Sequence, residues 1–534
     1  MTNVASNGQP ATTAERAADF VDALGVNIHT TYIDTSYGEV NPNVPPGSPG
    51  SLQPDPTKIE NALAYLGIDR VRDTAPDINS WTLSMYETEA AAGMKFDFVI
   101  PGGTVDLPGV MAGIDDIASK YPGSVVAVEG PNEVNGWPVT YDGQTGMAAA
   151  AALQKAIYAE VTSDPHLKGV PVYALTLGGA TPDQYAPLGD LSAYATNSNA
   201  HIYYGAQPPE GSIIYGLWVG EHDAPADPPV ITETGIYTAT PQPGTNATNT
   251  DVQAQYILDS LMDAAKNNVS DTYLYELLDE GTDPTVQEQN FGLFYANGTP
   301  KPVATAIHNL TTILADTGGT ATTFAPGQFA YSVNNLPRTE VAGFTASGSS
   351  LLLEKSSGAY DIVVWTEPPL WNQATATENT VGPSATTITF NRAYQTVKVF
   401  DPMQGSQALR VLHNVSSVSV MLTAHPVIVE VEPNATARQP AVAAAPVTAS
   451  ALTAVAVPQA AAGATTSNAA AMSVSELPGL WGSGDAALAW GATSSGVPAP
   501  ATFAGSAAAI SQEIAGAAAN LGQLALPSRT MLTV

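Results

Sequence analysis

The sequence has no cysteine, few basic residues and no long apolar run, and each absence excludes something. Without cysteine, disulfides, thiol nucleophiles and Cys-ligated metals are excluded. Lys and Arg number 17 against 49 Asp and Glu, and the resulting net charge of −32 repels nucleic-acid phosphates and anionic lipids. A neutral polymer suits this field better than a polyanionic substrate. No run of 18 strongly apolar residues is present, so no membrane span is expected.

Several functional motifs are also missing. The sequence has no HExxH, P-loop, GxSxG or Cys/His metal set, so neither a metal nor an organic cofactor is expected. The first twenty residues, MTNVASNGQPATTAERAADF, lack a basic region followed by an apolar core, so no standard secretory signal is visible. The acidic composition and the tail described below nevertheless favour a secreted protein.

What is present is a recurring unit of apolar strand, polar loop and helical stretch, repeated about every 30 to 40 residues. Eight strands are predicted, at 24–29, 70–73, 96–100, 125–129, 172–177, 200–204, 230–233 and 272–276. Helices are predicted at 59–66, 81–92, 110–120, 145–162, 183–195, 251–267 and 301–314. This pattern predicts a (β/α)8 TIM barrel over residues 17–317. The alternative, a doubly wound sheet, is disfavoured in its nucleotide-binding forms because no Gly-rich loop follows the first strand.

The composition changes twice after the barrel. Residues 318–433 contain short segments of alternating polarity separated by Gly, Pro and Asn turns, which predicts an antiparallel β-sandwich. Residues 434–534 form a low-complexity tail of Ala, Pro, Ser and Thr that is expected to be mostly disordered, because alanine buries too little area to offset the entropy of ordering. Residues 1–16 are small and polar, and disorder is expected there too.

Two of the predicted strands end close to a glutamate. VVAVEGPNEVN carries Glu133 and PVITETG carries Glu233. The carboxyl ends of barrel strands hold the active site of such folds, so these two side chains are expected to meet although they lie far apart in the chain. Two facing carboxylates are the arrangement that glycoside hydrolysis needs. A single Asn-Glu pair is usually an ordinary loop sequence; the joint pattern of two strands favours function.

With these residues the chain resembles the clan A retaining glycoside hydrolases, and family 39 in particular. GPNE (130–133) is similar to the Asn-Glu pair at the end of their fourth strand, and ITETG (231–235) to the glutamate at the end of the seventh. The resemblance covers about residues 20–315, and the β-sandwich is similar to their accessory domain. It implies Glu133 as the general acid/base and Glu233 as the nucleophile.

Neighbouring strand ends supply further candidates. The resemblance places an arginine near the nucleophile, here Arg72, and a His and a Tyr on the sixth strand, here His201 and Tyr203, with the Tyr hydroxyl bonding the nucleophile. Asn132 is expected to bind the sugar 2-hydroxyl, a contact that strengthens in the transition state.

Other candidates are more often structural than functional. His29 ends the first strand and is a candidate for the sugar subsite, while Trp137 and Trp218 are candidate stacking platforms. Many relatives carry a Trp at the end of the eighth strand, but this chain reads YLYELLDEG there, so Tyr275 or Glu276 is expected to take that position. The carboxylates of Glu276, Asp279 and Glu280 leave a Ca²⁺ site open, although their spacing matches no defined loop.

The sequence therefore predicts a retaining glycosidase that cleaves β-glycosidic bonds in an oligo- or polysaccharide. Long segments after the first and seventh strands, 31–56 and 237–249, are placed to wall a cleft. Two alternatives remain open: a transglycosidase that uses the same pair, and a non-catalytic carbohydrate-binding surface protein on a barrel scaffold. The presence of both glutamates argues against the second.

Overall fold

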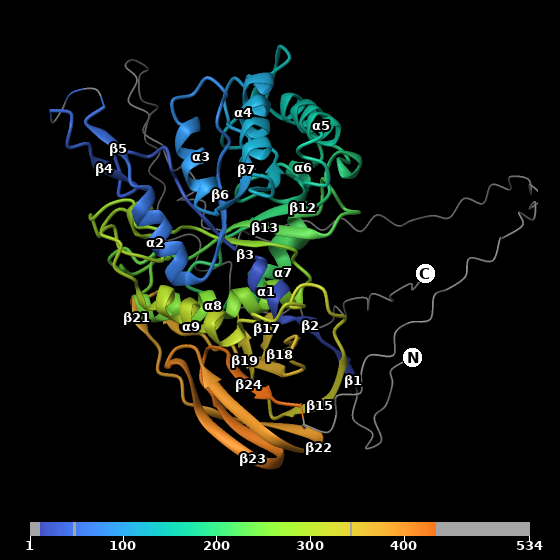
Figure 1. Ribbon diagram of the computed structural model, residues 1–534. Coiled ribbons are helices and arrows are strands. Elements are labelled where there is room, and N and C mark those ends of the chain that lie inside the picture. The colour runs from blue at the N-terminus through green and yellow to red at the C-terminus, as the bar shows by residue number, and fades with distance from the viewer. Residues whose placement is uncertain (1–10, 46–47, 49, 342–343, 434–534) are drawn as a thin grey trace, which may run out of the picture.

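The structure is a computed structural model that describes residues 11–45, 48, 50–341 and 344–433. The predicted tail at 434–534 lies outside the described residues, as do residues 1–10. Within the described part of the chain, no helix is long and apolar enough to cross a bilayer. The described chain forms a strand–helix barrel and a β domain that packs against one side of it (Figure 1).

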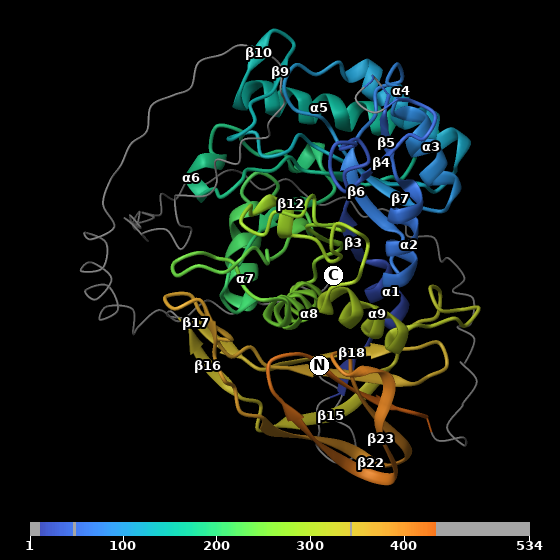
Figure 2. The same cartoon turned by 90° about the vertical axis from the view of Figure 1, so that its left-hand side faces the viewer.

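The barrel consists of eight parallel strands, as predicted. They follow the spatial order β11-β8-β7-β6-β3-β14-β13-β12, and a parallel bridge between Tyr173 and Asn197 joins the two ends of this order into a ring (Figure 2). Their bounds are β3 Leu24–Asn27, β6 Arg70–Thr74, β7 Lys95–Val99, β8 Val125–Glu129, β11 Val172–Tyr173, β12 Ser198–Ile202, β13 Pro229–Thr234 and β14 Thr272–Leu274. The predicted TIM barrel is confirmed, and the doubly wound alternative is wrong because the sheet closes.

A helix follows each barrel strand: α2 Pro56–Leu66, α3 Leu83–Ala91, α4 Leu107–Lys120, α5 Met147–Ser163, α6 Pro182–Tyr185, α7 Pro209–Gly220, α8 Thr250–Lys266 and α9 Pro302–Leu314. A further helix, α1 Ala17–Asp22, precedes β3. Several begin at a side-chain cap; Asp55, Asp106 and Asn249 each accept a backbone N–H of the first turn.

Two helix predictions differ from the structure. The helix predicted at 183–195 is only α6 and the 3-10 turn η1 Ser192–Tyr194, because Pro187 and Gly189, whose φ is +72°, interrupt it. Helix α7 was not predicted, since its Pro and Gly residues, and apolar residues spread around its circumference, hide the helical period.

The β domain is built on one path of strands, β1-β15-β22-β24-β19-β18-β2, with β23 paired to β22. The bounds are β15 Gln328–Asn334, β16 Arg338–Val341, β17 Phe344–Ser347, β18 Ser349–Glu354, β19 Tyr360–Trp365, β22 Ser384–Asp401, β23 Gly405–Leu422 and β24 Val427–Val431. One half of β22 pairs with β15 and the other with β24, with a register break at Thr389/Tyr394. Apolar side chains from both halves of the path share one core.

The disorder expected over the first sixteen residues is wrong for residues 11–16. β1 (Ala11–Thr13) pairs antiparallel with β15, and β2 (Glu15–Arg16) pairs parallel with β18. Ala14 between them is buried in the domain core. These residues are ordered because backbone hydrogen bonds to β15 and β18 compensate for their weak side-chain packing, which composition does not reveal.

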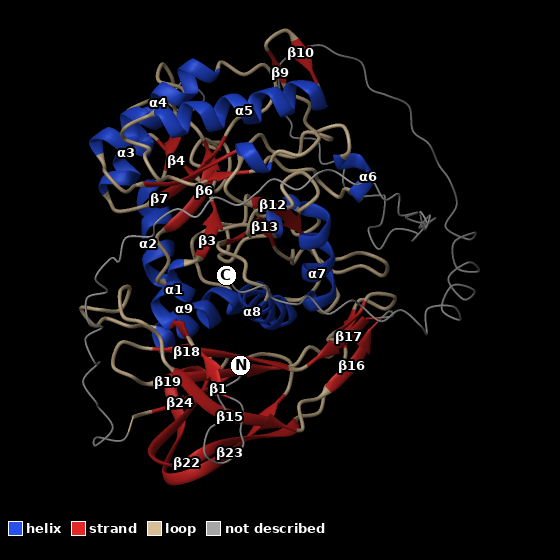
Figure 3. Ribbon diagram, turned by 90° about the vertical axis from the view of Figure 1, so that its right-hand side faces the viewer, coloured by secondary structure: helices blue, strands red, loops and turns tan. Residues whose placement is uncertain are grey.

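The β domain packs against α8 and α9 (Figures 1 and 3). The hydroxyl of Tyr256 on α8 donates to the carbonyl of Pro368 and accepts from the N–H of Leu370. Trp365 of β19 is fully buried and belongs to the same apolar cluster as the helices. Within the described part of the chain, the β domain thus covers the helices on one side of the barrel and does not cover the C-terminal ends of the barrel strands (Figures 1 and 3).

Candidate active site

The C-terminal ends of β8 and β13 bring Glu133 and Glu233 together. Parallel strands in a closed ring present their carboxyl ends on one rim, so residues far apart in sequence meet there. One carboxylate oxygen of Glu133, one of Glu233 and a ring nitrogen of His201 all lie within 4.8 Å of one another. Six residues named from the sequence gather at this point: Glu133, Glu233, Asn132, Arg72, His201 and Tyr203.

Glu233 is held by two donors on opposite oxygens. Arg72 donates from Nη1 to Oε1 at 2.7 Å, and the Tyr203 hydroxyl donates to Oε2 at 2.7 Å. The Glu233 side chain is 11% exposed. Burial, followed by the negative charge of Glu233, raises the pKa of Tyr203 well above its ordinary value, so this hydroxyl keeps its proton and acts as a donor.

A β-bulge turns Glu233 inward. Along β12 and β13 the register passes from Ala200↔Ile231 to His201↔Glu233, so one extra residue, Thr232, is accommodated in β13. The side chains of the consecutive residues Thr232 and Glu233 therefore both contact groups inside the barrel, which a regular strand does not allow.

Glu133 lies in a strained loop position that its surroundings fix. Its φ is +40°, in the left-handed region, while its N–H donates to Thr176 Oγ1 at 3.0 Å and its carbonyl accepts the N–H of Trp137 at 2.8 Å. Gly178 leaves the space for the side chain, because a Cβ at that position would lie 2.5 Å from the Cδ of Glu133. Backbone strain that the surrounding contacts hold in place is typical of functional sites.

Glu133 and His201 form a coupled pair, with Nδ1 of His201 2.9 Å from Oε1 of Glu133. Burial opposes ionisation of Glu133, but the hydrogen bond and charge of His201 outweigh it and place the pKa below the ordinary value. Burial likewise opposes the imidazolium, yet the charge of Glu233 and the bond to Glu133 raise the pKa of His201. The two groups therefore hold one proton between them, and its titration belongs to the pair.

Arg72 is the shared cation of the site. It donates from Nε and Nη2 to the two oxygens of Glu129 at 2.6 and 2.9 Å, and also to Asn27 at 2.9 Å and to Asn132 at 2.7 Å. Glu129 is fully buried and was not predicted from the sequence. The available signal was a carboxylate within an apolar strand, four residues before Glu133, because a buried charge needs a partner.

The residues from the ends of β3 and β14 form one wall of this region. His29 stacks on Tyr32 at a ring distance of 4.4 Å, and its Nε2 lies 3.3 Å from Oε2 of Glu276. Burial lowers the pKa of His29 to about 3, so it is neutral at physiological pH. Glu276 is fully buried; burial, then the charge of Glu280, raises its pKa well above the usual range. Tyr275, which forms a cis peptide bond with Glu276, is 7% exposed.

A second carboxyl, Glu288, was also missed by the sequence prediction. Its Oε2 accepts the Tyr275 hydroxyl at 3.4 Å. Burial and the charges of Glu280 and Glu233 raise the pKa of Glu288 to about 7. Glu288 begins the short 3-10 helix η2 (Glu288–Asn290) beyond β14, where the sequence shows no helical or strand period, so only the fold brings it near Glu133 and Glu233.

The two tryptophans lie in different places. Trp137 is 38% exposed and follows Glu133 by four residues, so it remains a candidate platform at the rim. The structure does not bring Trp218 to the site. Trp218 lies in the last turn of α7, where Gly220 packs against Asn199 and Ala200 near the start of β12, and this is the opposite end of the barrel. A helix runs back antiparallel to its strand, so a residue late in the helix lies far from the strand's carboxyl end.

Two groups at the mouth have the composition of a cation site, namely Glu133, His201 and Glu233, and His29, Glu276 and Glu280. A third group, Asp115, Asp164 and His166, lies at the surface. The carboxylates of Glu276, Asp279 and Glu280 do not form one Ca²⁺ site. Asp279 is engaged elsewhere, because it pairs with Lys301 at 2.7 Å and accepts the N–H of Gly292.

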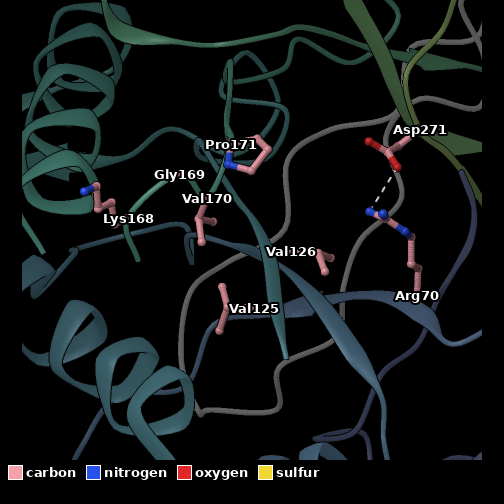
Figure 4. Close-up of a pocket in the computed structure, with 8 residues that line it drawn as sticks. All are labelled: Arg70, Val125, Val126, Lys168, Gly169, Val170, Pro171 and Asp271. Carbon is pink, nitrogen blue, oxygen red and sulfur yellow. Dashed lines mark ion pairs between the residues drawn. The ribbon is translucent and has the colours of Figure 1, made fainter. Parts of the chain in front are cut away.

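A pocket of about 350 Å³ lies at the other rim of the barrel (Figure 4). It is lined by Arg70, Val125, Val126, Lys168, Gly169, Val170, Pro171 and Asp271, all at or before the starts of strands. Arg70 pairs with Asp271 at 3.1 Å and with Asp22 at 2.6 Å. The pocket is therefore separate from the carboxylate pair.

No protein-family model and no curated protein matches the sequence. Solved structures do match the fold. A family 39 glycoside hydrolase from Bacteroides cellulosilyticus aligns with a TM-score of 0.50 and 13% identity over 78% of this chain and 82% of that chain. A family 51 α-L-arabinofuranosidase from Thermotoga petrophila aligns with a TM-score of 0.50 and 12% identity over 79% and 98%. The chain thus has the barrel-and-β-domain fold of these glycoside hydrolases.

Proposed function

We propose that the protein is a retaining glycoside hydrolase that cleaves β-glycosidic bonds in an oligo- or polysaccharide. The observation that carries this proposal is that one carboxylate oxygen of Glu133 lies within 4.8 Å of one carboxylate oxygen of Glu233 at the barrel mouth. A retaining mechanism needs carboxyl groups about 5–5.5 Å apart, whereas an inverting one needs about 6.5–9.5 Å to admit a water molecule. The spacing supports double displacement.

The two carboxyls divide the chemistry. Glu233 attacks the anomeric carbon while the proton held by Glu133 and His201 passes from Glu133 to the leaving oxygen, and a glycosyl ester forms on Glu233. Glu133, now ionised, removes a proton from water, whose oxygen attacks the same carbon and releases Glu233. Two inversions at one carbon leave the β configuration unchanged.

The surroundings suit the nucleophile directly, whereas the acid depends on a shared proton, because the pKa of Glu133 lies below its ordinary value and that of His201 lies above it. Arg72 and Tyr203 each donate a hydrogen bond to Glu233. These bonds stabilise its negative charge and hold its two oxygens in a defined orientation. His201 contacts Glu133 and supplies the second position for the shared proton. A binding protein without catalysis has no need of this unequal treatment of two carboxyls, which argues against the non-catalytic alternative.

The test compares wild type with Glu133→Ala and Glu233→Ala on neutral aryl β-glycosides and on a panel of polysaccharides. Removal of Glu233 is expected to lower kcat by ~10⁴-fold or more, and removal of Glu133 by about 10²–10⁴-fold. Azide added to Glu233→Ala is expected to give the glycosyl azide of inverted configuration. The exposed Glu160 of α5 provides the matched control, Glu160→Ala, with wild-type rates. Rates unchanged in both active-site variants would falsify the assignment, and sugar transfer to acceptors in place of water would favour a transglycosidase.

A further inference from the structure

A buried chain of hydrogen bonds connects Glu133 to Glu233 through the interior of the barrel. Its central members are Glu129 of β8 and Thr232 of β13, and both are fully buried. On one side, Glu129 takes two hydrogen bonds from Arg72, and Arg72 donates a further one to Glu233 at 2.7 Å.

On the other side, the chain continues through the hydroxyl of Thr232. Its Oγ1 lies 3.2 Å from Oε1 of Glu129, 2.9 Å from Oδ1 of Asn199 and 3.1 Å from Nε2 of His201. The opposite ring nitrogen, Nδ1 of His201, faces Glu133 at 2.9 Å. The imidazole is thus held between one hydroxyl and one carboxyl.

The proton inventory of Thr232 decides which ring nitrogen carries hydrogen. The hydroxyl has one proton, and the Glu129 carboxylate only accepts. Asn199 presents its oxygen, because its Nδ2 donates to the carbonyl of Ala174 at 3.2 Å. The hydroxyl proton therefore goes to one of these two oxygens, and a lone pair remains toward His201. Nε2 must then be the N–H donor. Oε1 of Glu129, 4.0 Å from Nε2, favours the same state.

We propose that Thr232 and Glu129 are positioning residues that fix His201 as the Nε2–H tautomer and fix Arg72 against Glu233, so that one buried link serves both catalytic carboxyls. The proposal rests on the proposed function for its kinetic consequences and on the structure alone for the tautomer.

The tautomer controls how readily the Glu133–His201 pair loses its proton. With Nε2–H fixed, the deprotonated pair has the bare Nδ1 lone pair facing the Glu133 carboxylate, which is repulsive, so the pair retains its proton to higher pH. Without the Thr232 hydroxyl, the neutral ring can place its hydrogen on Nδ1 and donate to Glu133, which favours the deprotonated pair. The other titratable groups around the pair do not change in this comparison. They are Arg72 of β6, Glu129 of β8, Tyr185 of α6, Tyr203 directly after β12, Glu233 of β13 and Glu288 of η2 (Glu288–Asn290).

The test compares Thr232→Val, which keeps the shape and removes the hydroxyl, with Thr232→Ser, which restores it. The pH profile of kcat/KM is measured for the full chain on a neutral aryl β-glycoside. The alkaline limb of Thr232→Val is expected to move down by about one pH unit, the size of one buried hydrogen bond, while Thr232→Ser follows wild type. A profile of Thr232→Val that superimposes on wild type, or an equal shift in both variants, overturns the proposal.

A second readout does not depend on activity. Nitrogen-15 NMR of histidine-labelled protein, with His201→Gln to assign the signal, reports the tautomer directly. The neutral His201 ring is expected to be Nε2–H in wild type and to gain Nδ1–H character in Thr232→Val. A wild-type ring that is Nδ1–H contradicts the proposal even if the variant fails to fold. If wild type hydrolyses no glycoside, the proposed function fails, and the tautomer still decides the structural part.

Discussion

Two regions of this protein contain clusters of buried carboxyl groups, and the two clusters differ in their hydrogen-bond donors and cations. At the barrel mouth, Glu129 and Glu233 share the cation Arg72. Where α8 meets the β domain, three acids are fully or almost fully buried: Asp259, Asp263 and Glu367. Among the described residues, no lysine or arginine forms an ion pair with these three; Lys266 pairs with Glu210 at 3.7 Å and lies over the ring of Trp365.

The difference lies in which charge state the surroundings favour. At the interface, burial and then the charge of Glu367 raise the pKa of Asp263 well above its usual value, and burial raises that of Glu367 to about 7. A protonated Asp263 can donate a hydrogen bond to Glu367, which joins α8 to the β domain. At the mouth, the cation and the hydroxyl donors stabilise the negative charge of Glu129 and Glu233, while the pKa values of Glu276 and Glu288 beside them are raised. Donors and a cation that stabilise negative charge thus distinguish the acids at the mouth from those at the interface.

The largest effect is expected from Arg72→Lys at the mouth. Lysine keeps the charge but replaces the planar fork that serves Glu129, Glu233, Asn27 and Asn132 with a point donor. We expect kcat to fall by about 10²-fold, measured on a neutral aryl β-glycoside. Arg70→Lys, two residues earlier on β6 but at the opposite rim, is the control and should keep kcat close to wild type. Equal losses in the two variants would contradict the contrast.

A smaller effect, on stability instead of activity, is expected from Asp263→Asn at the interface. The folded pKa of Asp263 lies above its unfolded value, so the folded state binds the extra proton and its stabilisation is lost as pH rises. Glu367 adds a window from its usual 4.5 to about 7. Wild type is therefore expected to melt at a lower temperature at pH 8 than at pH 5.

Asparagine mimics the protonated acid as a donor to Glu367 and carries no titratable proton. Asp263→Asn is expected to raise the free energy of unfolding at pH 8 by the order of 1–3 kcal/mol and to reduce the difference between pH 5 and pH 8, as measured by thermal unfolding. Glu160→Gln on the exposed face of α5 should leave the pH dependence unchanged. A larger pH dependence in Asp263→Asn would show that Asp263 is ionised in the folded protein.

The smallest effect is expected at Asp97, a carboxyl close to the mouth whose pKa is raised like those of the interface acids. Asp97 on β7 is fully buried, and within the described part of the chain neither of its oxygens accepts a hydrogen bond. Burial and the charge of Glu129 raise its pKa well above the usual value. We expect Asp97→Asn to keep kcat within about threefold of wild type, ~0.7 kcal/mol, because an amide replaces a protonated acid. Glu129→Gln, which removes the anionic partner of Arg72, should lose much more. A loss in Asp97→Asn as large as that in Glu129→Gln would show that Asp97 is ionised.

The sequence predicted the barrel because each strand is a short apolar run and most helices carry a clear period. It missed α7 and overextended the segment after β11, since Pro and Gly obscure local periodicity. It also predicted which strand ends carry Glu133, Glu233, Arg72, His201 and Tyr203. Trp218 was wrongly expected at the active site because it lies shortly before β13 in the sequence. It is in the last turn of α7, and the end of a helix that leads into a strand lies at the rim opposite the site.

By itself, the sequence determined the order of the eight barrel strands, the acidic charge and the positions of two glutamates after apolar strands, because these follow from local pattern and composition. Only the tertiary structure decided that a bulge in β13 turns Thr232 and Glu233 inward together, that Glu129 shares Arg72 with Glu233, and that Glu288 approaches the pair. The physical reason is that register and through-space electrostatics depend on which strands become neighbours when the ring closes, and no local stretch of residues contains that information.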